Sequence, residues 1–325
     1  PILERRSSRP GDFPTFFELM TGLALFHFAR ERVDHAVIEV GLGGRLDATN
    51  VVDAPIVAIT SIGLEHTRIL GSTLGAIARE KAGIIKDGAT VVVGNLPREA
   101  RAVIGEVARE RKARVIDVDP DHVIANADGL RWRGMPWPVA APSIRGPALR
   151  ASLALALDLH AEVLAREGRA PDPTAITEAL RNLSLPGRVE LFEGPPAVLI
   201  DGAHTAESFA LLAECLPELA LPSPRTVIFS IAADKNVEPI LDLVRTIGDD
   251  FLWTRADPVR SLDPAELQAR TGVGTVIEDP KEALEHALER GHSIVVCGSL
   301  YLAGTIRSAL RSIQRAAEER TAQAS

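Results

Sequence analysis

Short apolar runs rich in β-branched residues alternate with glycine turns between residues 37 and 86 of this 325-residue chain. Residues 36–40 and 56–62 are two such runs, and each has the composition of a strand that is buried on both faces of a parallel sheet. Residues 73–85, which follow them, carry apolar side chains at helical spacing. Because parallel strands need a long crossover connection, usually a helix, this alternation predicts an α/β fold with a mainly parallel sheet.

Three chemically reactive side chains lie where these strands and this helix are expected to end. Glu39 is at the end of the first run, His66 follows the second, and Lys81 is on the polar side of the helix. Ligands of open α/β sheets bind beyond the carboxyl ends of the strands, so we expect Glu39 and His66 to face one crevice. Taken singly, each has a simpler interpretation: a solvated carboxylate, a hydrogen-bonded structural histidine and a lysine that faces water.

The loop that follows Glu39 reads Gly41-Leu42-Gly43-Gly44-Arg45. Repeated glycines let backbone N–H groups approach a ligand closely, which favours a binding site at this point. Arg45 is a candidate anion contact, and a surface arginine is the equally weighted alternative. A dinucleotide-dependent oxidoreductase would also place Gly-x-Gly after a strand, but its fingerprint needs a glycine or alanine where this chain has Leu46.

The second half of the chain repeats the pattern of a strand followed by polar side chains. Residues 197–200 have the pattern of a buried strand that ends in Asp201-Gly202-Ala203-His204, and strand and helix patterns alternate up to residue 297. Leu185-Pro186-Gly187 is a helix stop followed by a turn. We therefore predict two domains, residues 1–185 and 186–325, the second being a smaller doubly wound α/β domain.

Local sequence patterns predict a helix and a β-hairpin elsewhere in the first domain. Thr15 and Glu18 have the spacing of a capping box, and an apolar stripe over residues 16–29 predicts a helix that packs against the sheet. Asp128-Gly129 lies between alternating residues over 122–133, which predicts a β-hairpin.

Charge and hydropathy exclude several functional classes. The net charge of -8 argues against general nucleic-acid binding, which requires a basic face. No apolar stretch is long enough to span a bilayer and no signal peptide is visible. Cys215 and Cys297 lie in apolar surroundings without metal-ligand spacing, and they are typical of buried thiols in a cytosolic protein. We therefore expect a cytoplasmic protein that binds neither nucleic acid nor a membrane. We also expect a monomer.

Several blocks in the same order resemble one known family. They are E-V-G-L-G-G-R-L-D-A-T-N-V from Glu39, T-S-I-G-L-E-H-T-x-x-L-G from Thr60, E-K-A-G-I-I-K from Glu80, and then P-G-R-V-E, D-G-A-H-T-A-E-S and G-S-L-Y-L-A-G in the second half. Together they resemble the folylpolyglutamate synthase and dihydrofolate synthase family of the Mur ligase superfamily. The resemblance spans residues from about 15 to 310.

The resemblance implies a Mur-ligase-like central domain with a mainly parallel sheet, followed by a smaller Rossmann-like carboxyl-terminal domain. It implies an ATP-dependent ligase that adds L-glutamate to folate or to dihydropteroate through an acyl phosphate. Magnesium and ATP are the implied cofactor and co-substrate. Glu39, His66 and Lys81 are the implied metal ligands, with Lys81 carbamylated so that it offers anionic oxygen.

The family also implies roles in catalysis and nucleotide binding. Lys81, Asp201 and His204 are the implied catalytic residues. The implied nucleotide contacts are Arg188, Asp201, Arg45 and Lys235, with a surface lysine as the even alternative for Lys235.

One expected element is not found. A ligase of this kind carries a phosphate-binding loop of the form G-x-x-x-x-G-K-[ST], but the dipeptide Gly-Lys occurs nowhere in this chain, which begins at Pro1. We expect the loop in an upstream segment of a longer protein. A non-catalytic paralogue that has lost the loop is the alternative.

Overall fold

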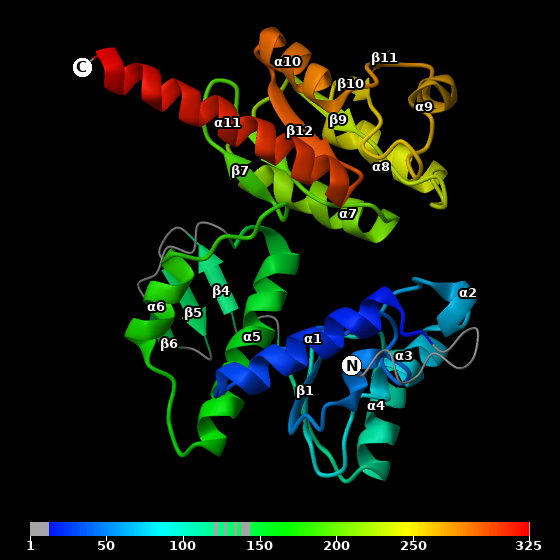
Figure 1. Ribbon diagram of the computed structural model, residues 1–325, viewed down its shortest axis with the longest axis vertical. Helices are drawn as coiled ribbons and strands as arrows, with labels where there is room; N and C mark the ends of the chain where they lie inside the picture. The colour runs from blue at the N-terminus through cyan, green and yellow to red at the C-terminus, as the bar shows by residue number, and fades with distance from the viewer. Residues whose placement is uncertain (1–12, 120–122, 127–128, 133–134, 138–143, 325) are drawn as a thin grey trace. The chain divides into compact units, whose positions relative to one another are not determined.

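The computed structural model describes residues 13–119, 123–126, 129–132, 135–137 and 144–324. The chain divides into two compact units, Pro1–Val123 with Ala151–Asp172, and Ile124–Arg150 with Pro173–Ser325. Each unit contains a parallel sheet with helices packed on it (Figure 1), which confirms the predicted α/β class. The predicted domain boundary between residues 185 and 186 stays a prediction.

The first unit is built on three parallel strands in the order β1-β2-β3. The central strand β2 is buried along its whole length. Val57, Val91 and Val93 project to the face that α3 and α4 cover, and their apolar side chains form one core. The bounds are β1 Ile56–Ile59, β2 Thr90–Val93, β3 Arg114–Asp117, α1 Phe16–Glu31, η1 Ala48–Val51, α2 Thr67–Leu70, α3 Leu74–Ala82, α4 Arg98–Glu110 and α5 Gly146–Arg166.

The predicted strand at residues 36–40 is wrong. These residues form no strand, and Val37 is 98% exposed. A strand needs a neighbour for its backbone hydrogen bonds, and β1, the nearest predicted partner, is at the edge of its sheet and pairs with β2 alone among the described strands. Glu39 therefore lies on an exposed irregular segment and not at the end of a strand.

Helix α1 begins as predicted, because Thr15 and Glu18 form the full capping box. The expectation that its apolar stripe packs against the sheet is wrong: none of its residues is buried, and Phe16 and Phe26 are 80% and 67% exposed. Helix formation here follows from the cap and the local sequence, which act without a tertiary partner.

A small sheet joins β4, β5 and β6 in that order, with β5 and β6 antiparallel. The predicted hairpin strands are therefore present, while Asp128 of its predicted turn lies outside the described residues. The bounds are β4 Val123–Asn126, β5 Gly129–Trp132 and β6 Met135–Trp137.

The second unit has a six-stranded sheet in the order β11-β10-β9-β12-β8-β7. All neighbours in it are parallel except β7, which runs antiparallel to β8 at one edge. The bounds are α6 Pro173–Arg181, β7 Glu190–Phe192, β8 Val198–Ile200, α7 Ala206–Cys215, η3 Leu216–Glu218, β9 Arg225–Phe229, α8 Glu238–Ile247, β10 Asp250–Trp253, α9 Pro264–Thr271, β11 Thr275–Val276, α10 Pro280–Arg290, β12 Ser293–Cys297 and α11 Leu300–Ala324.

Helices cover both faces of this sheet (Figure 1, lime green to red). Apolar side chains of α7, α8 and α9 pack on one face, and those of α10 and α11 pack on the other. Because β8, β9, β10, β11 and β12 are parallel, their carboxyl ends meet at one edge. The predicted doubly wound arrangement is therefore confirmed.

Both cysteines are buried, as predicted from their apolar surroundings. Burial raises the pKa of the Cys215 thiol to about 11 and raises that of the Cys297 thiol well above its ordinary value. These thiols therefore stay protonated and are poor nucleophiles at neutral pH. Among the described helices, none combines the length and the apolar character needed to cross a membrane.

Candidate functional site

Asp201 follows the last residue of β8 at the carboxyl edge of the second unit's sheet. It is 8% exposed, and its two carboxylate oxygens accept backbone hydrogen bonds from Val189 (2.8 Å) and Ala203 (2.7 Å). Burial raises the pKa of Asp201, and these hydrogen bonds together with the charges of Arg188 and His204 only partly offset that rise. The carboxylate is therefore engaged mainly with its own backbone.

The loop that carries Arg188 has an unusual backbone. Gly187 and Val189 both have positive φ, 65° and 45°, and a β-branched residue such as Val189 is rare in this region. The Gly187 carbonyl accepts a hydrogen bond from the Gly202 N–H (2.8 Å). A Cβ on Gly202 would lie 2.6 Å from the Arg188 Nη1 atom, so the guanidinium lies directly over the turn between Asp201 and His204.

His204 lies just before α7 and is half-buried. Its Nδ1 atom is 2.9 Å from the Gly202 carbonyl oxygen. A carbonyl oxygen can only accept, so Nδ1 carries the proton in the neutral ring and Nε2 is left as an acceptor. The backbone is held in place by Ser208, whose hydroxyl accepts from the His204 N–H (3.0 Å) and forms a capping box with Thr205. His204 is thus oriented to accept a proton or a hydrogen bond.

Lys235 lies in the turn between β9 and α8 and is half-exposed. This turn is at the same carboxyl edge as Asp201, because β8 and β9 are both parallel neighbours of β12. The structure therefore brings Arg188, Asp201 and His204 together, with Lys235 farther along the edge.

In the first unit, the glycine loop packs on the end of α3. The Arg45 N–H donates to the Glu80 carbonyl (2.8 Å). A Cβ on Gly44 would lie 2.9 Å from that oxygen and 3.0 Å from the carbonyl oxygen of Lys81. Glycine is therefore required for this close approach, which places the loop beside the backbone of Lys81. The Arg45 side chain forms an ion pair with Glu80 (3.0 Å).

Asp47 fixes the other end of this loop. Its carboxylate accepts hydrogen bonds from the Leu42 N–H (2.9 Å) and from the Thr49 N–H and hydroxyl (2.9 and 2.6 Å). Partial burial acts to raise the pKa of Asp47, but the hydrogen bonds from Thr49 and Leu42 outweigh it and lower the pKa. Asp47 is therefore a carboxylate at neutral pH and orders the whole loop.

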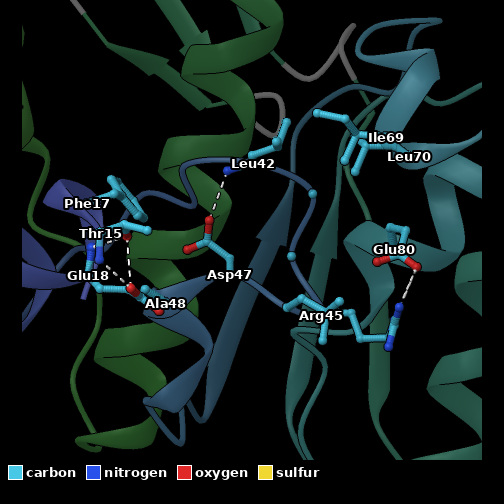
Figure 2. Close-up of a pocket in the computed structure, with 13 residues that line it drawn as sticks. Thr15, Phe17, Glu18, Leu42, Arg45, Asp47, Ala48, Ile69, Leu70 and Glu80 are labelled. Atoms are coloured by element: carbon cyan, nitrogen blue, oxygen red, sulfur yellow. Dashed lines mark hydrogen bonds and ion pairs between the residues drawn. The ribbon is translucent and has the colours of Figure 1, made fainter. Parts of the chain in front are cut away.

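A pocket of about 310 Å³ lies between this loop and the start of α1 (Figure 2). Two of its residues, Phe17 and Asp47, were not among the site residues predicted from the sequence. The signal for Asp47 was present in Asp47-x-Thr49, the spacing of an Asx-turn. The pocket is lined by Thr15, Phe17, Glu18, Leu42, Gly43, Gly44, Arg45, Leu46, Asp47, Ala48, Ile69, Leu70 and Glu80.

The three predicted metal ligands all lie in the first unit. Glu39 and His66 are exposed and Lys81 is half-buried in the last turn of α3. His66 has φ 51° and is the N-cap residue of α2, but its side chain forms no cap hydrogen bond. By donor type, Glu39 suits Mg²⁺, His66 suits softer divalent ions, and Lys81 suits either ion only as a carbamate. Within the described residues, no group of three or more histidine, cysteine, aspartate or glutamate side chains could hold a metal ion, so this three-residue site, which includes a lysine, stays a prediction.

Comparison with known proteins identifies the family to which this chain is similar. The family described as Mur ligase, glutamate ligase domain, matches residues 187–300. Folylpolyglutamate synthase of Lacticaseibacillus casei is 33% identical over 95% of this chain and 74% of its own length. Dihydrofolate synthase/folylpolyglutamate synthase of Bacillus subtilis is 33% identical over 92% of this chain and 73% of its own length.

Solved structures agree in fold. The structure of E. coli FolC in complex with DHPP and ADP has a TM-score of 0.79 at 28% identity, covering 95% of this chain and 74% of that one. Mycobacterium tuberculosis folylpolyglutamate synthase complexed with ADP and AMPPCP has a TM-score of 0.78 at 28% identity, covering 94% and 75%. The family resemblance and the ligase class predicted from the sequence are confirmed: this chain belongs to the folylpolyglutamate and dihydrofolate synthase family of Mur ligases.

Proposed function

We propose that this protein uses ATP to join L-glutamate to a folate or dihydropteroate acceptor. The observation that carries the proposal is the 33% identity to folylpolyglutamate synthase over 95% of the chain. The arrangement of Arg188, Asp201 and His204 at one sheet edge supports it, because ligands of such sheets bind beyond the carboxyl ends of the strands.

The reaction we propose has two steps. The acceptor's carboxylate attacks the γ-phosphorus of ATP, which forms an acyl phosphate and releases ADP. The amino group of glutamate then attacks the acyl carbon, the amide bond forms, inorganic phosphate leaves and the amine loses a proton. The Nε2 atom of His204 is the acceptor we assign to that proton, since Nδ1–H is held by the Gly202 carbonyl.

Two cations are assigned to the anions of this reaction. The Arg188 guanidinium is exposed at the sheet edge and has the planar geometry that suits phosphate oxygens. Lys235, farther along the edge, is assigned to a carboxylate or phosphate of the substrates. Arg45 stays a candidate nucleotide contact, although its guanidinium is paired with Glu80.

A divalent cation is also part of the proposal. A relative from Yersinia pestis was solved with AMPPNP and a Mn ion. Glu39, His66 and a carbamylated Lys81 would hold the ion in this chain, where it would offset the negative charge of the phosphates. Mass spectrometry of gently purified protein tests the carbamate as an added carbon dioxide on the peptide that contains Lys81.

The pocket beside the glycine loop suits the acceptor's flat heterocycle. Its volume of about 310 Å³ is at the lower end of the range for small-molecule sites. Phe17 is 42% exposed and offers an aromatic face, and Glu18 offers its carboxylate to ring N–H donors (Figure 2). We assign the pterin ring of the acceptor to this pocket.

The test is turnover by the protein expressed from its complete gene. With Mg²⁺, ATP and glutamate, release of ADP should require dihydropteroate or a reduced folate, and the acceptor should gain the mass of one glutamyl residue. The control omits glutamate. No ADP release and no mass gain with either acceptor would refute the ligase proposal. ATP binding without turnover would support the non-catalytic paralogue.

A further inference from the structure

Arg260 is an exposed arginine in the loop that follows β10, at the carboxyl edge of the second unit's sheet. Its Nη1 atom donates a hydrogen bond to the Tyr301 hydroxyl (3.2 Å), and its guanidinium carbon is 6.0 Å from the centre of the Tyr301 ring. The nearby Arg255 and Arg270 are paired with carboxylates, whereas among the described residues none forms an ion pair with Arg260. Its guanidinium therefore keeps most of its N–H donors for a ligand.

Hydrogen bonds fix the backbone of the loop that carries Arg260. The Arg260 carbonyl accepts from the Ala233 N–H (2.8 Å), and the Asp257 carboxylate accepts from the Arg260 N–H (3.0 Å). The Ser261 hydroxyl accepts from the Asp257 N–H (2.9 Å) and is 3.2 Å from the Ser230 hydroxyl. Because these bonds do not involve the guanidinium, truncation of the Arg260 side chain should leave the loop intact.

The first turn of α11 places Tyr301 near the turn that carries His204. A Cβ on Gly202 would lie 2.3 Å from the Leu300 Cδ2 atom, so α11 begins directly against that turn. Strand β12, which precedes α11, pairs with β8, and paired strands are about 4.8 Å apart. Tyr301 is 57% exposed, and its hydroxyl, which accepts from Arg260, still has its own hydrogen to donate.

This arrangement matches the two ends of a dicarboxylic amino acid. The reaction proposed above requires the amine of glutamate beside the Nε2 atom of His204. The side-chain carboxylate of glutamate is at the far end of a short carbon chain from that amine, so it would extend toward the end of a neighbouring strand. There the Arg260 guanidinium and the Tyr301 hydroxyl can both donate to one carboxylate, and such charge-assisted hydrogen bonds are strong.

We propose that Arg260 and Tyr301 form the subsite for the side-chain carboxylate of the incoming glutamate, and that they determine specificity for this amino acid. The inference rests on the proposed function in taking free glutamate as the second substrate. Glutamine has nearly the same shape as glutamate but no side-chain charge. A site built to hydrogen-bond a substrate group discriminates against an analogue that lacks it, so glutamine is the competitor that this subsite rejects.

Steady-state kinetics with dihydropteroate as acceptor tests the subsite, because dihydropteroate has no glutamyl group of its own. Arg260→Ala should raise KM for glutamate about 10- to 100-fold and Tyr301→Phe about three- to tenfold, with kcat within about twofold and KM for ATP unchanged. The preference for glutamate over glutamine in kcat/KM should fall in Arg260→Ala by the same factor as its kcat/KM for glutamate. A loss of kcat/KM that is equal for the two amino acids would overturn the proposal.

The matched control is Arg311→Ala. Arg311 is also an exposed arginine of α11, and it lies about 15 Å beyond Tyr301 along the helix at 1.5 Å per residue. Its replacement removes the same charge from the same unit and should leave KM for glutamate unchanged. If Arg260→Ala raises KM only for a folate acceptor that already carries a glutamyl tail, the pair binds that tail, and the assignment to free glutamate is wrong.

Tyr301 also permits a binding measurement that does not depend on turnover, because it is the single tyrosine of this 325-residue chain. Protein labelled with fluorotyrosine gives a fluorine NMR signal that Tyr301→Phe identifies by its loss. With Mg²⁺, dihydropteroate and a non-hydrolysable ATP analogue present, titrated L-glutamate should shift this signal in wild type and in Arg311→Ala. It should cause no shift in Arg260→Ala, and L-glutamine should shift the wild-type signal much less.

The subsite and the ligase activity can fail separately. If wild type makes no product but glutamate shifts the Tyr301 signal in a way that depends on Arg260, the proposed function fails and the carboxylate subsite stands. If product forms while glutamate leaves the signal in place and Arg260→Ala has the KM of wild type for glutamate, the ligase stands and the subsite is overturned.

Discussion

Gly202→Ala is a direct test of where the Arg188 guanidinium lies. An added Cβ would be 2.3 Å from Leu300 Cδ2 and 2.6 Å from Arg188 Nη1, so both atoms must move. Both are at the ends of flexible side chains, and Gly202 does not have the positive φ that would strain alanine. The substitution should therefore displace the guanidinium and leave the backbone of the turn intact.

The structure sets the size of two separate effects. Leu300 is 49% exposed and Arg188 is exposed, so relief of the clash is cheap. Overpacking costs up to about 1–3 kcal/mol and the glycine replacement itself gains about 0.4–1 kcal/mol, so we expect a net loss of stability near 1 kcal/mol. Loss of one hydrogen bond between a guanidinium and a phosphate costs about 1.5–3 kcal/mol, which is roughly a 10- to 150-fold loss of ATP affinity.

Calorimetric titration of ATP and urea denaturation measure the two effects separately. Gly304→Ala is the control. Gly304 belongs to the same unit as Gly202, and a Cβ added there would have no other atom within 4 Å. This variant should leave ATP affinity unchanged and stabilise α11 by about 0.5–1 kcal/mol. If Gly202→Ala binds ATP like wild type while Arg188→Ala does not, the guanidinium position described above is not the one that binds phosphate.

Three further predictions concern the pocket, the glycine loop and pH. Phe17→Ala should raise KM for the acceptor about tenfold and leave KM for ATP unchanged, as steady-state kinetics with each substrate varied would show; equal effects on both would contradict the pocket assignment. Gly44→Ala should destabilise the protein by about 1–3 kcal/mol in urea, because its Cβ would meet the backbone oxygen of Glu80 rather than a movable side chain. Burial raises the pKa of Asp201 above its ordinary value of about 3.9. Between these two pKa values the native state binds more protons than the unfolded state, so the contribution of Asp201 to the free energy of unfolding falls as pH rises. Asp201→Asn removes that contribution, so its stability relative to wild type should improve from about pH 4 upward; a difference that stays constant with pH would contradict the buried titration.

The elements that sequence patterns predicted well are those with buried faces. β2 and β12 are the clearest cases, because every residue in each is buried and the apolar run has no interruption. β7 was missed since its three residues are only half-buried at an antiparallel edge. Helix α10 was missed as well, although Asp279 and Pro280 form an N-cap and first-turn signal.

Residues 36–40 and α1 are segments whose burial was predicted wrongly. Their composition predicts burial, but burial depends on a partner, which composition does not specify. Val37 has strand-forming character and is 98% exposed, and α1 has its predicted cap but buries no side chain. Local signals such as the Thr15 cap are decided within a few residues, so they were predicted correctly; packing is decided by distant residues, so it was not.

In the candidate site, the sequence could identify candidate residues but not their roles. Position relative to a strand end was enough to select Asp201 and His204 as candidates, because the carboxyl edge of a parallel sheet gathers polar residues. It could not distinguish their roles, which depend on how their hydrogen-bonding capacity is used. The Nδ1 of His204 is held by a carbonyl and its Nε2 is left to accept, whereas both oxygens of Asp201 hold backbone N–H groups. The bond from Val189 needs a valine at positive φ, which its propensity argues against, so no pattern rule could have predicted that Asp201 holds the Arg188 loop.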